Sequence, residues 1–145
     1  MKASVVTPNY NGKKFLKTYF DSLNRNKDSV GEVILVDNGS TDGSIEFIKD
    51  YSKNLDFPVI MIRNVENLGF AKAVNQGILK SNYDYIFSLN NDTEVEKGAV
   101  KSLMDLISSD EDIFSVASKM LKFDNKNLID DAGDEYNILA WTKKT

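Results

Sequence analysis

The 145-residue chain contains no cysteine and no histidine. The absence of cysteine excludes disulfide bonds, thiolate nucleophiles and thiolate zinc sites. The absence of histidine excludes imidazole acid–base chemistry. Carboxylates must therefore carry any proton transfer or metal binding in which this chain takes part.

An excess of positive charge is also absent. The 18 basic and 22 acidic residues give a net charge of −4, and no basic stripe interrupts the sequence, so we expect no nucleic-acid partner. The apolar runs are far shorter than the ~20 residues of a membrane helix, and Met1-Lys2-Ala3 leads directly into a predicted strand instead of a signal peptide. We expect a cytoplasmic protein, with peripheral association to a membrane surface left open.

What the chain does contain is a regular alternation of short apolar runs and helical patterns. With 41% hydrophobic residues over 145 positions, it is large enough for one domain with its own core. We expect strands over 3–7, 32–36, 58–63, 85–89 and 113–123. We expect helices over 13–26, from Ser40 or Thr41 through Tyr51, from near Gly69 to Lys80, and over 98–107. This order predicts an α/β fold, a three-layer α/β/α sandwich with a mostly parallel sheet.

The ends of these elements can also be predicted. Pro8 is expected to end the first strand because it has no N–H for a ladder. Asn11 is expected to cap the first helix, and Ser40 or Thr41 the second. From residue 124 onward the periodicity fades, so we expect a single domain over 1–145 with an ordered core of about 1–123 and an irregular tail over 124–145.

Polar clusters follow the apolar runs in SVVTPNYN, EVILVDNGSTDGS and YIFSLNNDTE. In an open α/β sheet, ligands lie outside the carboxyl ends of the strands, so Asn9, Asp37, Asn90 and Asp92 are predicted to converge on one site. Asp37 ends a buried strand, where its carboxylate can accept a hydrogen bond from a base or a ribose. An ordinary turn followed by a helix cap would also satisfy this composition.

The segment Asn90-Asn91-Asp92 offers oxygen ligands of the kind that hard divalent cations prefer. Mg²⁺ takes only one or two carboxylates because water and substrate phosphates complete its shell, so Asp92 could supply the carboxylate and Asn90 a neutral oxygen. A strand-ending turn is the structural alternative. Gly69, at a predicted helix start with Lys72 one turn later, would suit a pyrophosphate, although Lys72 alone is as easily a solvated lysine.

In this order and spacing, the segments VVTPNYNG, EVILVDNGSTDGS, ENLGFAKAVNQGI and YIFSLNNDTEVEKGAV resemble the family 2 glycosyltransferases with the GT-A fold. The resemblance is strongest to the rhamnosyltransferase-like branch and covers roughly residues 3–125. It implies a hexosyltransferase of glycan or polysaccharide biosynthesis with a UDP, GDP or dTDP sugar as donor and a glycan or lipid-linked acceptor. It also implies Mg²⁺ or Mn²⁺ as cofactor and transfer with inversion.

The resemblance assigns roles by position. The nucleotide-sugar-binding residues would be Pro8, Tyr10, Asn11, Asp37, Asn67, Gly69, Lys72, Asn90 and Asn91. Asp92 would be the metal-binding carboxylate of the DXD-like motif, in which Asn90 replaces the first acidic residue and leaves the identity of the metal open. The catalytic base has no match by position. Asp130 and Asp131 are the candidates, and solvated charges are the alternative interpretation of this pair. From the resemblance, we expect the C-terminal acceptor half of such a domain to be largely absent.

Other readings compete with this one. The chain could be a non-catalytic fragment that holds a nucleotide sugar or self-associates as a homodimer. A receiver-like signalling domain would need an acidic pair where this chain has Thr7-Pro8-Asn9. A dinucleotide-dependent oxidoreductase would need a Gly-x-Gly-x-x-Gly turn after a strand. A sugar-phosphate nucleotidyltransferase would need a glycine-rich basic loop after the first strand. The sequence contains neither motif.

Overall fold

The computed structural model describes residues 1–131, 134–136 and 142–144. The chain divides into two compact units, Met1–Met104 and Asp105–Thr145. The predicted site residues, apart from Asp130 and Asp131, all belong to the first unit. Residues 132–133, 137–141 and 145 of the predicted tail lie outside the described residues.

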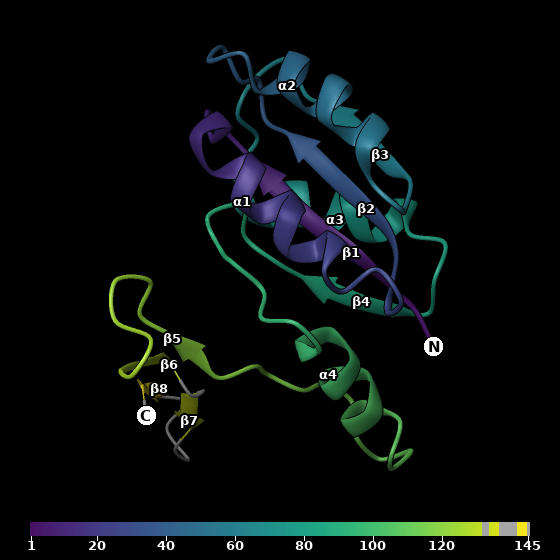
Figure 1. Ribbon diagram of the computed structural model, residues 1–145, viewed down its shortest axis with the longest axis vertical. Coiled ribbons are helices and arrows are strands. Elements are labelled where there is room, and N and C mark those ends of the chain that lie inside the picture. Colours follow the sequence, from purple (N-terminus) through teal and green to yellow (C-terminus); the bar gives the residue numbers. More distant parts are fainter. Residues whose placement is uncertain (132–133, 137–141, 145) are drawn as a thin grey trace. The chain divides into compact units, whose positions relative to one another are not determined.

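The first unit is built on a four-stranded sheet in the order β3-β2-β1-β4, with every pairing parallel (Figure 1). The strands are β1 (Ala3–Asn9), β2 (Val30–Asp37), β3 (Val59–Arg63) and β4 (Tyr85–Ser88), and the helices are α1 (Lys13–Asn24), α2 (Ser44–Tyr51), η1 (Ser52–Asn54), α3 (Phe70–Lys80) and α4 (Ala99–Ile107). This confirms the predicted α/β class. Because the strands are parallel, their carboxyl ends meet at one edge of the sheet.

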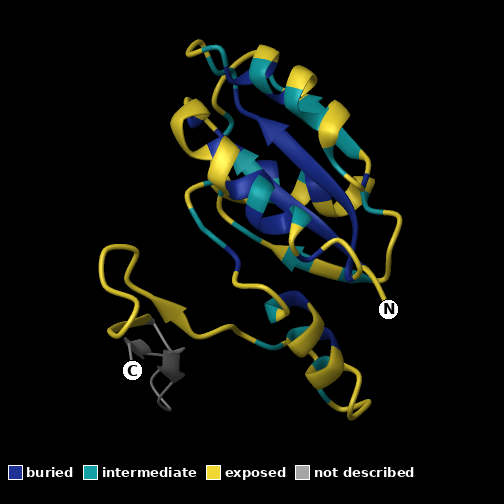
Figure 2. Cartoon of the chain, in the orientation of Figure 1, coloured by how far each residue is buried: buried dark blue, intermediate teal, exposed yellow. Residues whose placement is uncertain are grey.

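Two hydrophobic clusters cover the two faces of this sheet. On one face, α1 and α2 pack on alternate residues of β1 and β2 such as Val5 and Leu35. On the other, Ala73 of α3 packs against Val6 and Ile34, which are the neighbours of Val5 and Leu35 in the strands. β1 and β2 are buried along almost their whole length (Figure 2), which explains why they read as continuous apolar runs.

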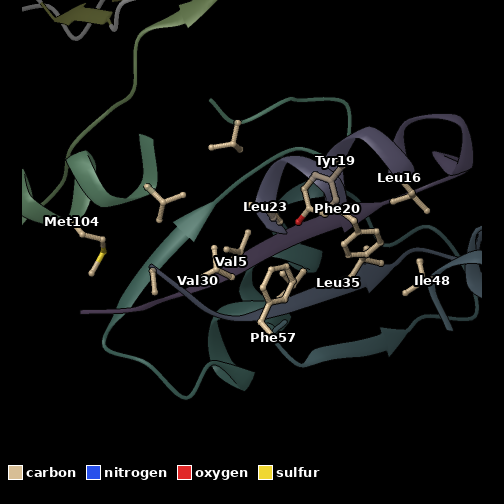
Figure 3. Packing of buried hydrophobic residues seen from close by; sticks show 14 residues of the cluster. Val5, Leu16, Tyr19, Phe20, Leu23, Val30, Leu35, Ile48, Phe57 and Met104 are labelled. Carbon is tan, nitrogen blue, oxygen red and sulfur yellow. The ribbon is translucent and has the colours of Figure 1, made fainter. Parts of the chain in front are cut away.

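The helix α1 forms because its apolar residues recur at helical spacing, and all of them except the exposed Phe15 pack on the sheet. Its buried apolar side chains are Leu16, Tyr19, Phe20 and Leu23 (Figure 3). The Phe20 ring lies edge-on to Tyr19 with centroids 5.1 Å apart, and stacks on Tyr51 of α2 at 6.0 Å. These aromatic contacts fix α1 and α2 beside each other above the sheet.

The prediction that Pro8 ends the first strand is wrong, because β1 continues to Asn9 and Pro8 pairs with Val36. The carbonyl of Asn9 accepts a hydrogen bond from the residue after β2, and that of Val6 accepts one from Leu89 after β4. Since N–H groups alternate sides along a strand, the nitrogen of Pro8 faces the β4 side. The pairing of β1 with β4 extends only to Val6, so the missing N–H of Pro8 removes no hydrogen bond between these two strands.

The predicted helix caps also differ from those observed. Gly12, not Asn11, is the N-cap of α1, and Gly43, not Ser40 or Thr41, is the N-cap of α2. Gly43 has φ of +83°, a left-handed conformation that favours glycine. Ser40 and the Asn11 side chain are used instead in bonds between loops, which are described below.

In the second unit, the described strands are short. β5 (Met120–Leu121) pairs antiparallel with β6 (Ile129–Asp131), and β7 (Asp134–Tyr136) pairs antiparallel with β8 (Thr142–Lys144). The strand predicted over 113–123 is therefore wrong for all but Met120 and Leu121. A strand needs a paired neighbour, and the apolar residues from 113 to 119 have none among the described residues.

Candidate functional site

Two predicted site residues lie side by side where β1 and β2 end. Asn9 and Asp37 are register partners, and the Asn9 Nδ2 donates a hydrogen bond of 2.8 Å to Asp37 Oδ2. Their exposed fractions are 1% and 0%. The bond compensates the burial of the carboxylate, which would otherwise be strongly unfavourable.

The loop after β2 is held against the loop after β1 by hydrogen bonds in both directions. The Ser40 N–H donates to Asp37 Oδ1 at 2.9 Å, and the Ser40 Oγ accepts from the Asn11 N–H at 2.9 Å. The Thr41 N–H in turn donates to Asn11 Oδ1 at 2.8 Å. Asn11 has φ of +50°, a left-handed conformation that asparagine tolerates better than most residues. The two loops thus form one connected rim.

Asp42 extends this rim to the start of both helices. Its carboxylate accepts bonds from the Lys13 N–H at 2.9 Å and from the Ser44 N–H at 3.0 Å, so it fixes the entries to α1 and α2 together. Burial would raise the pKa of Asp42, but these bonds and that from the Ser44 hydroxyl outweigh burial and hold the pKa below its usual value. Asp42 is therefore a structural anion at the base of the rim.

The loop after β4 reaches the same rim through Asn91. Its Nδ2 donates to Asn9 Oδ1 at 2.6 Å. The flanking residues Asn90 and Asp92 are exposed, and the carbonyl of Asn90 is bonded by the Thr93 hydroxyl at 2.6 Å, which forms a tight turn. Asn9 therefore contacts both Asp37 and Asn91, and the exposed Asp92 follows Asn91 in the chain.

A second amide network, which the sequence did not reveal, joins the Asp37 loop to the start of α3. Asn38 Nδ2 donates to the Gly69 carbonyl at 3.3 Å, and Asn64 Nδ2 donates to Asn38 Oδ1 at 2.8 Å. Asn64 also exchanges bonds of 2.8 and 3.0 Å with the Gln76 side chain. Asn64 follows β3 directly, so its position at a strand end was the one available signal.

The remaining predicted residues lie around this rim with more exposure. Gly69 has φ of +87°, and its N–H donates a hydrogen bond of 2.9 Å to Asn67 Oδ1. Lys72 is exposed on the first turn of α3. Tyr10 is 53% exposed, whereas Pro8 is half-buried. These positions place exposed backbone, one aromatic ring and one lysine at the carboxyl edge of the sheet.

Asp130 and Asp131 lie in β6 of the second unit. Asp130 is exposed. The residues Ala132 and Gly133 that follow them lie outside the described residues.

The oxygen ligands at the candidate site can be compared with those that the predicted divalent cation requires. Within the described part of the chain, no group of three or more carboxylates forms a ready-made metal cage. An exposed Asp92 beside asparagine side chains fits a hard cation that completes its shell with water and substrate phosphates. Asp92 and Asn90 are the residues that would hold such a cation.

Comparison with known proteins defines the family. A model of "Glycosyl transferase family 2" matches residues 4–143, and the chain belongs to this family. The glycosyltransferase YfnE of Bacillus subtilis is 38% identical over 101 residues, which are 69% of this chain and 25% of YfnE. The abequosyltransferase RfbV of Salmonella typhimurium is 32% identical over 117 residues, which are 79% of this chain and 35% of RfbV. The chain thus spans about a third or less of these relatives.

Solved structures confirm the fold. TarS 1-349 of S. aureus in complex with UDP superposes with a TM-score of 0.66 at 23% identity, over 84% of this chain and 40% of that one. A mannosyltransferase of Pyrobaculum calidifontis in complex with GDP-Man and Mn²⁺ gives 0.69 at 18% identity, over 74% and 32%. The parallel sheet is therefore that of the GT-A glycosyltransferases. Within the described residues, no helix is long and apolar enough to cross a bilayer.

Proposed function

We propose that this chain binds a nucleotide-diphosphate sugar and forms the donor-binding part of a glycosyltransferase that uses Mg²⁺ or Mn²⁺ and transfers the sugar to an acceptor hydroxyl with inversion. The observation that supports this most is the hydrogen-bonded cluster of Asn9, Asp37 and Asn91 at the carboxyl edge of the sheet. Ligands of open α/β sheets lie at this edge. The family and the structures with bound UDP and GDP-Man named above support sugar transfer from a nucleotide donor in general.

On this proposal, the nucleotide lies against the rim made by the loops after β1 and β2. Tyr10 offers an exposed ring for the base, and Pro8 and Asn11 lie within two residues of it in the chain. Asp37 is 0% exposed and accepts hydrogen bonds from Asn9 and Ser40, so it holds the two loops together below the surface that the base would contact. Its first effect is to orient the rim on which the base would rest.

The diphosphate would lie between the start of α3 and the loop after β4. Gly69 has no side chain to obstruct its backbone, and a Cβ added there would meet nothing within 4 Å. Lys72 supplies positive charge one turn into the helix, and Asn67 holds the loop that precedes it. A cation held by Asp92 and Asn90 would supply Lewis-acid stabilisation of the charge that develops on the leaving diphosphate.

Inverting transfer also requires a carboxylate that removes the proton of the acceptor hydroxyl. Asp130 and Asp131 are the candidates that this chain offers, and replacing each by asparagine in a chain that shows turnover would test them. The acceptor, the cytoplasmic location, a homodimer and peripheral membrane association stay predictions from the sequence.

The test is calorimetric titration of UDP, GDP and dTDP with and without Mn²⁺ or Mg²⁺. We expect one nucleotide to bind in a cation-dependent way, and we expect Asp92→Ala to remove that dependence. Asp84→Ala is the matched control, because Asp84 is an exposed carboxylate in the loop before β4, at the opposite edge of the sheet. If none of the three nucleotides binds, the proposal is wrong. If binding occurs without sugar transfer, the chain is the non-catalytic binding fragment.

A further inference from the structure

Asn9 is the residue through which the two halves of the candidate site contact each other. It ends β1, which lies between β2 and β4 in the sheet (Figure 1). Its Nδ2 donates to Asp37 Oδ2 at 2.8 Å and to Ser40 Oγ at 3.1 Å, while its Oδ1 accepts from Asn91 Nδ2 at 2.6 Å. One buried amide therefore joins the loop after β2 to the loop after β4.

The orientation of these amides follows from Asp37. Both oxygens of the Asp37 side chain accept hydrogen bonds, Oδ1 from the Ser40 N–H and Oδ2 from Asn9, so Asn9 presents its nitrogen to Asp37. Its oxygen then faces Asn91, which must present its own nitrogen in turn. The Asn91 oxygen, a ligand type that hard cations accept, is thereby turned away from Asn9. A buried carboxylate on β2 thus determines how the loop that contains Asp92 is presented.

Gly12 provides independent evidence that this contact constrains the sequence. A Cβ at position 12 would lie 2.0 Å from Asn91 Nδ2 and 2.6 Å from Asn9 Oδ1. The backbone of Gly12 has φ of −102°, which any residue can adopt. Glycine is therefore needed here for space and not for conformation, and the space that it leaves is occupied by the Asn9–Asn91 hydrogen bond.

We propose that Asn9 is a positioning residue that couples nucleotide binding to cation binding, by holding the Asn91–Asp92 loop at a fixed place relative to the Asp37–Ser40 loop. This inference rests on the proposed function, because it concerns how the two parts of the same site act together. Asn9 itself is buried and touches neither ligand. Its effect passes through Asn91 on one side and Asp37 on the other.

The experiment compares two ligands in four proteins. On the proposed function, binding of a nucleoside diphosphate with Mn²⁺ depends on both loops. Binding of the matching monophosphate depends mainly on the Asp37–Ser40 loop, which is the nucleotide loop. Gly12→Ala and Asn91→Ala disturb the contact without removing a partner of Asp37. Asn64→Ala is the control, because Asn64 holds the same nucleotide loop from the α3 side. Amide hydrogen exchange of residues 89–93 is measured in each protein without ligand.

We expect Gly12→Ala and Asn91→Ala to lose about fivefold to tenfold in Mn²⁺-dependent diphosphate affinity, the equivalent of one hydrogen bond. Their monophosphate affinity should stay within about twofold, as a local contact predicts. Exchange of residues 89–93 should accelerate in both. Asn64→Ala should change the two affinities by the same factor and leave that exchange unchanged.

Two results would overturn the inference. One is diphosphate affinity in Gly12→Ala and Asn91→Ala equal to that of the wild type. The other is an equal loss of both affinities, which would mean general loosening of the fold. If the wild type binds no nucleotide, the proposed function fails separately, and exchange still decides the positioning role: unchanged exchange at residues 89–93 in both variants would refute it.

Discussion

Replacing Glu32 by glutamine should weaken the fold and leave the candidate site intact. Glu32 lies near the start of β2, at the edge of the sheet opposite the site, and is 3% exposed. Its Oε1 accepts bonds from the Ser4 hydroxyl at 2.6 Å and the Asn82 N–H at 2.7 Å, and its Oε2 accepts from Asn82 Nδ2 at 2.8 Å. The carboxylate ties the loop before β4 to β1 and β2.

The magnitude follows from these three bonds. A glutamine oxygen can keep the bonds from Ser4 and the Asn82 N–H, but its Nε2 would face the Asn82 Nδ2, donor against donor. One bond is lost and two lose charge assistance, so we expect about 2 kcal/mol of destabilisation at pH 7. For a chain of this size, that corresponds to roughly 8 °C in Tm.

The effect should depend on pH in a defined direction. Burial alone would raise the pKa of Glu32, but bonds from Ser4 and Asn82, together with the charge of Lys80, outweigh it and lower the pKa. A carboxyl whose pKa is lower in the folded state stabilises the fold above its unfolded pKa of about 4.3, and this stabilisation is lost as the pH falls. The difference between wild type and Glu32→Gln should therefore shrink below about pH 5.

Urea unfolding at pH 7 and pH 4 measures both effects, and nucleotide titration checks the site. Asp50→Asn is the control, since Asp50 forms an exposed pair with Lys53, and its variant should unfold like the wild type. The reasoning would be refuted if the free energies of unfolding of wild type and Glu32→Gln differed by less than about 0.5 kcal/mol at pH 7. It would also be refuted if they differed by the same amount at both pH values. Altered nucleotide affinity would show that the two edges of the sheet are not independent.

Further predictions concern the core and the donor site. Phe20→Ala should lower the free energy of unfolding by about 3–5 kcal/mol, because the ring is fully buried between Tyr19 and Tyr51; a loss below about 1 kcal/mol in urea unfolding would contradict this packing. Gly77→Ala should cost about 1–3 kcal/mol in the same assay, since a Cβ there would lie 2.4 Å from Val6 Cγ1. A stabilised variant would mean that α3 moves away from β1 easily. Lys72→Ala should weaken diphosphate binding several-fold, and the loss should shrink at high salt, whereas a salt-independent loss would argue against a charge contact.

The strand–helix order could be predicted because buried parallel strands read as apolar runs and α1 repeats its apolar residues at helical spacing. The same rule failed over 113–123, where the run is apolar but has no neighbouring strand to pair with among the described residues. An apolar run shows that a segment can be buried. It does not show that a partner strand is present.

The site could be predicted only at the level of the edge on which it lies. Strand ends identified Asn9, Asp37 and the loop of Asn91, because register follows from parallel pairing. Which amide faces which group could not be read, since that depends on contacts between residues up to 82 positions apart. The helix caps failed for the same reason: Asn11 and Ser40 could each cap a helix locally, but in the fold they bond to each other's loop.

The chemistry of the rim explains why it contains so many asparagines and so few charges. Two carboxylates at the strand ends could bind a cation, but side by side without one they would repel each other. Here Asp37 is fully buried and accepts hydrogen bonds from Asn9 and Ser40, while Asp92 is exposed. The amides of Asn9 and Asn91 lie between them and transmit orientation without adding charge. On the proposed function, one carboxylate therefore fixes the geometry of the rim, and the other binds the ligand.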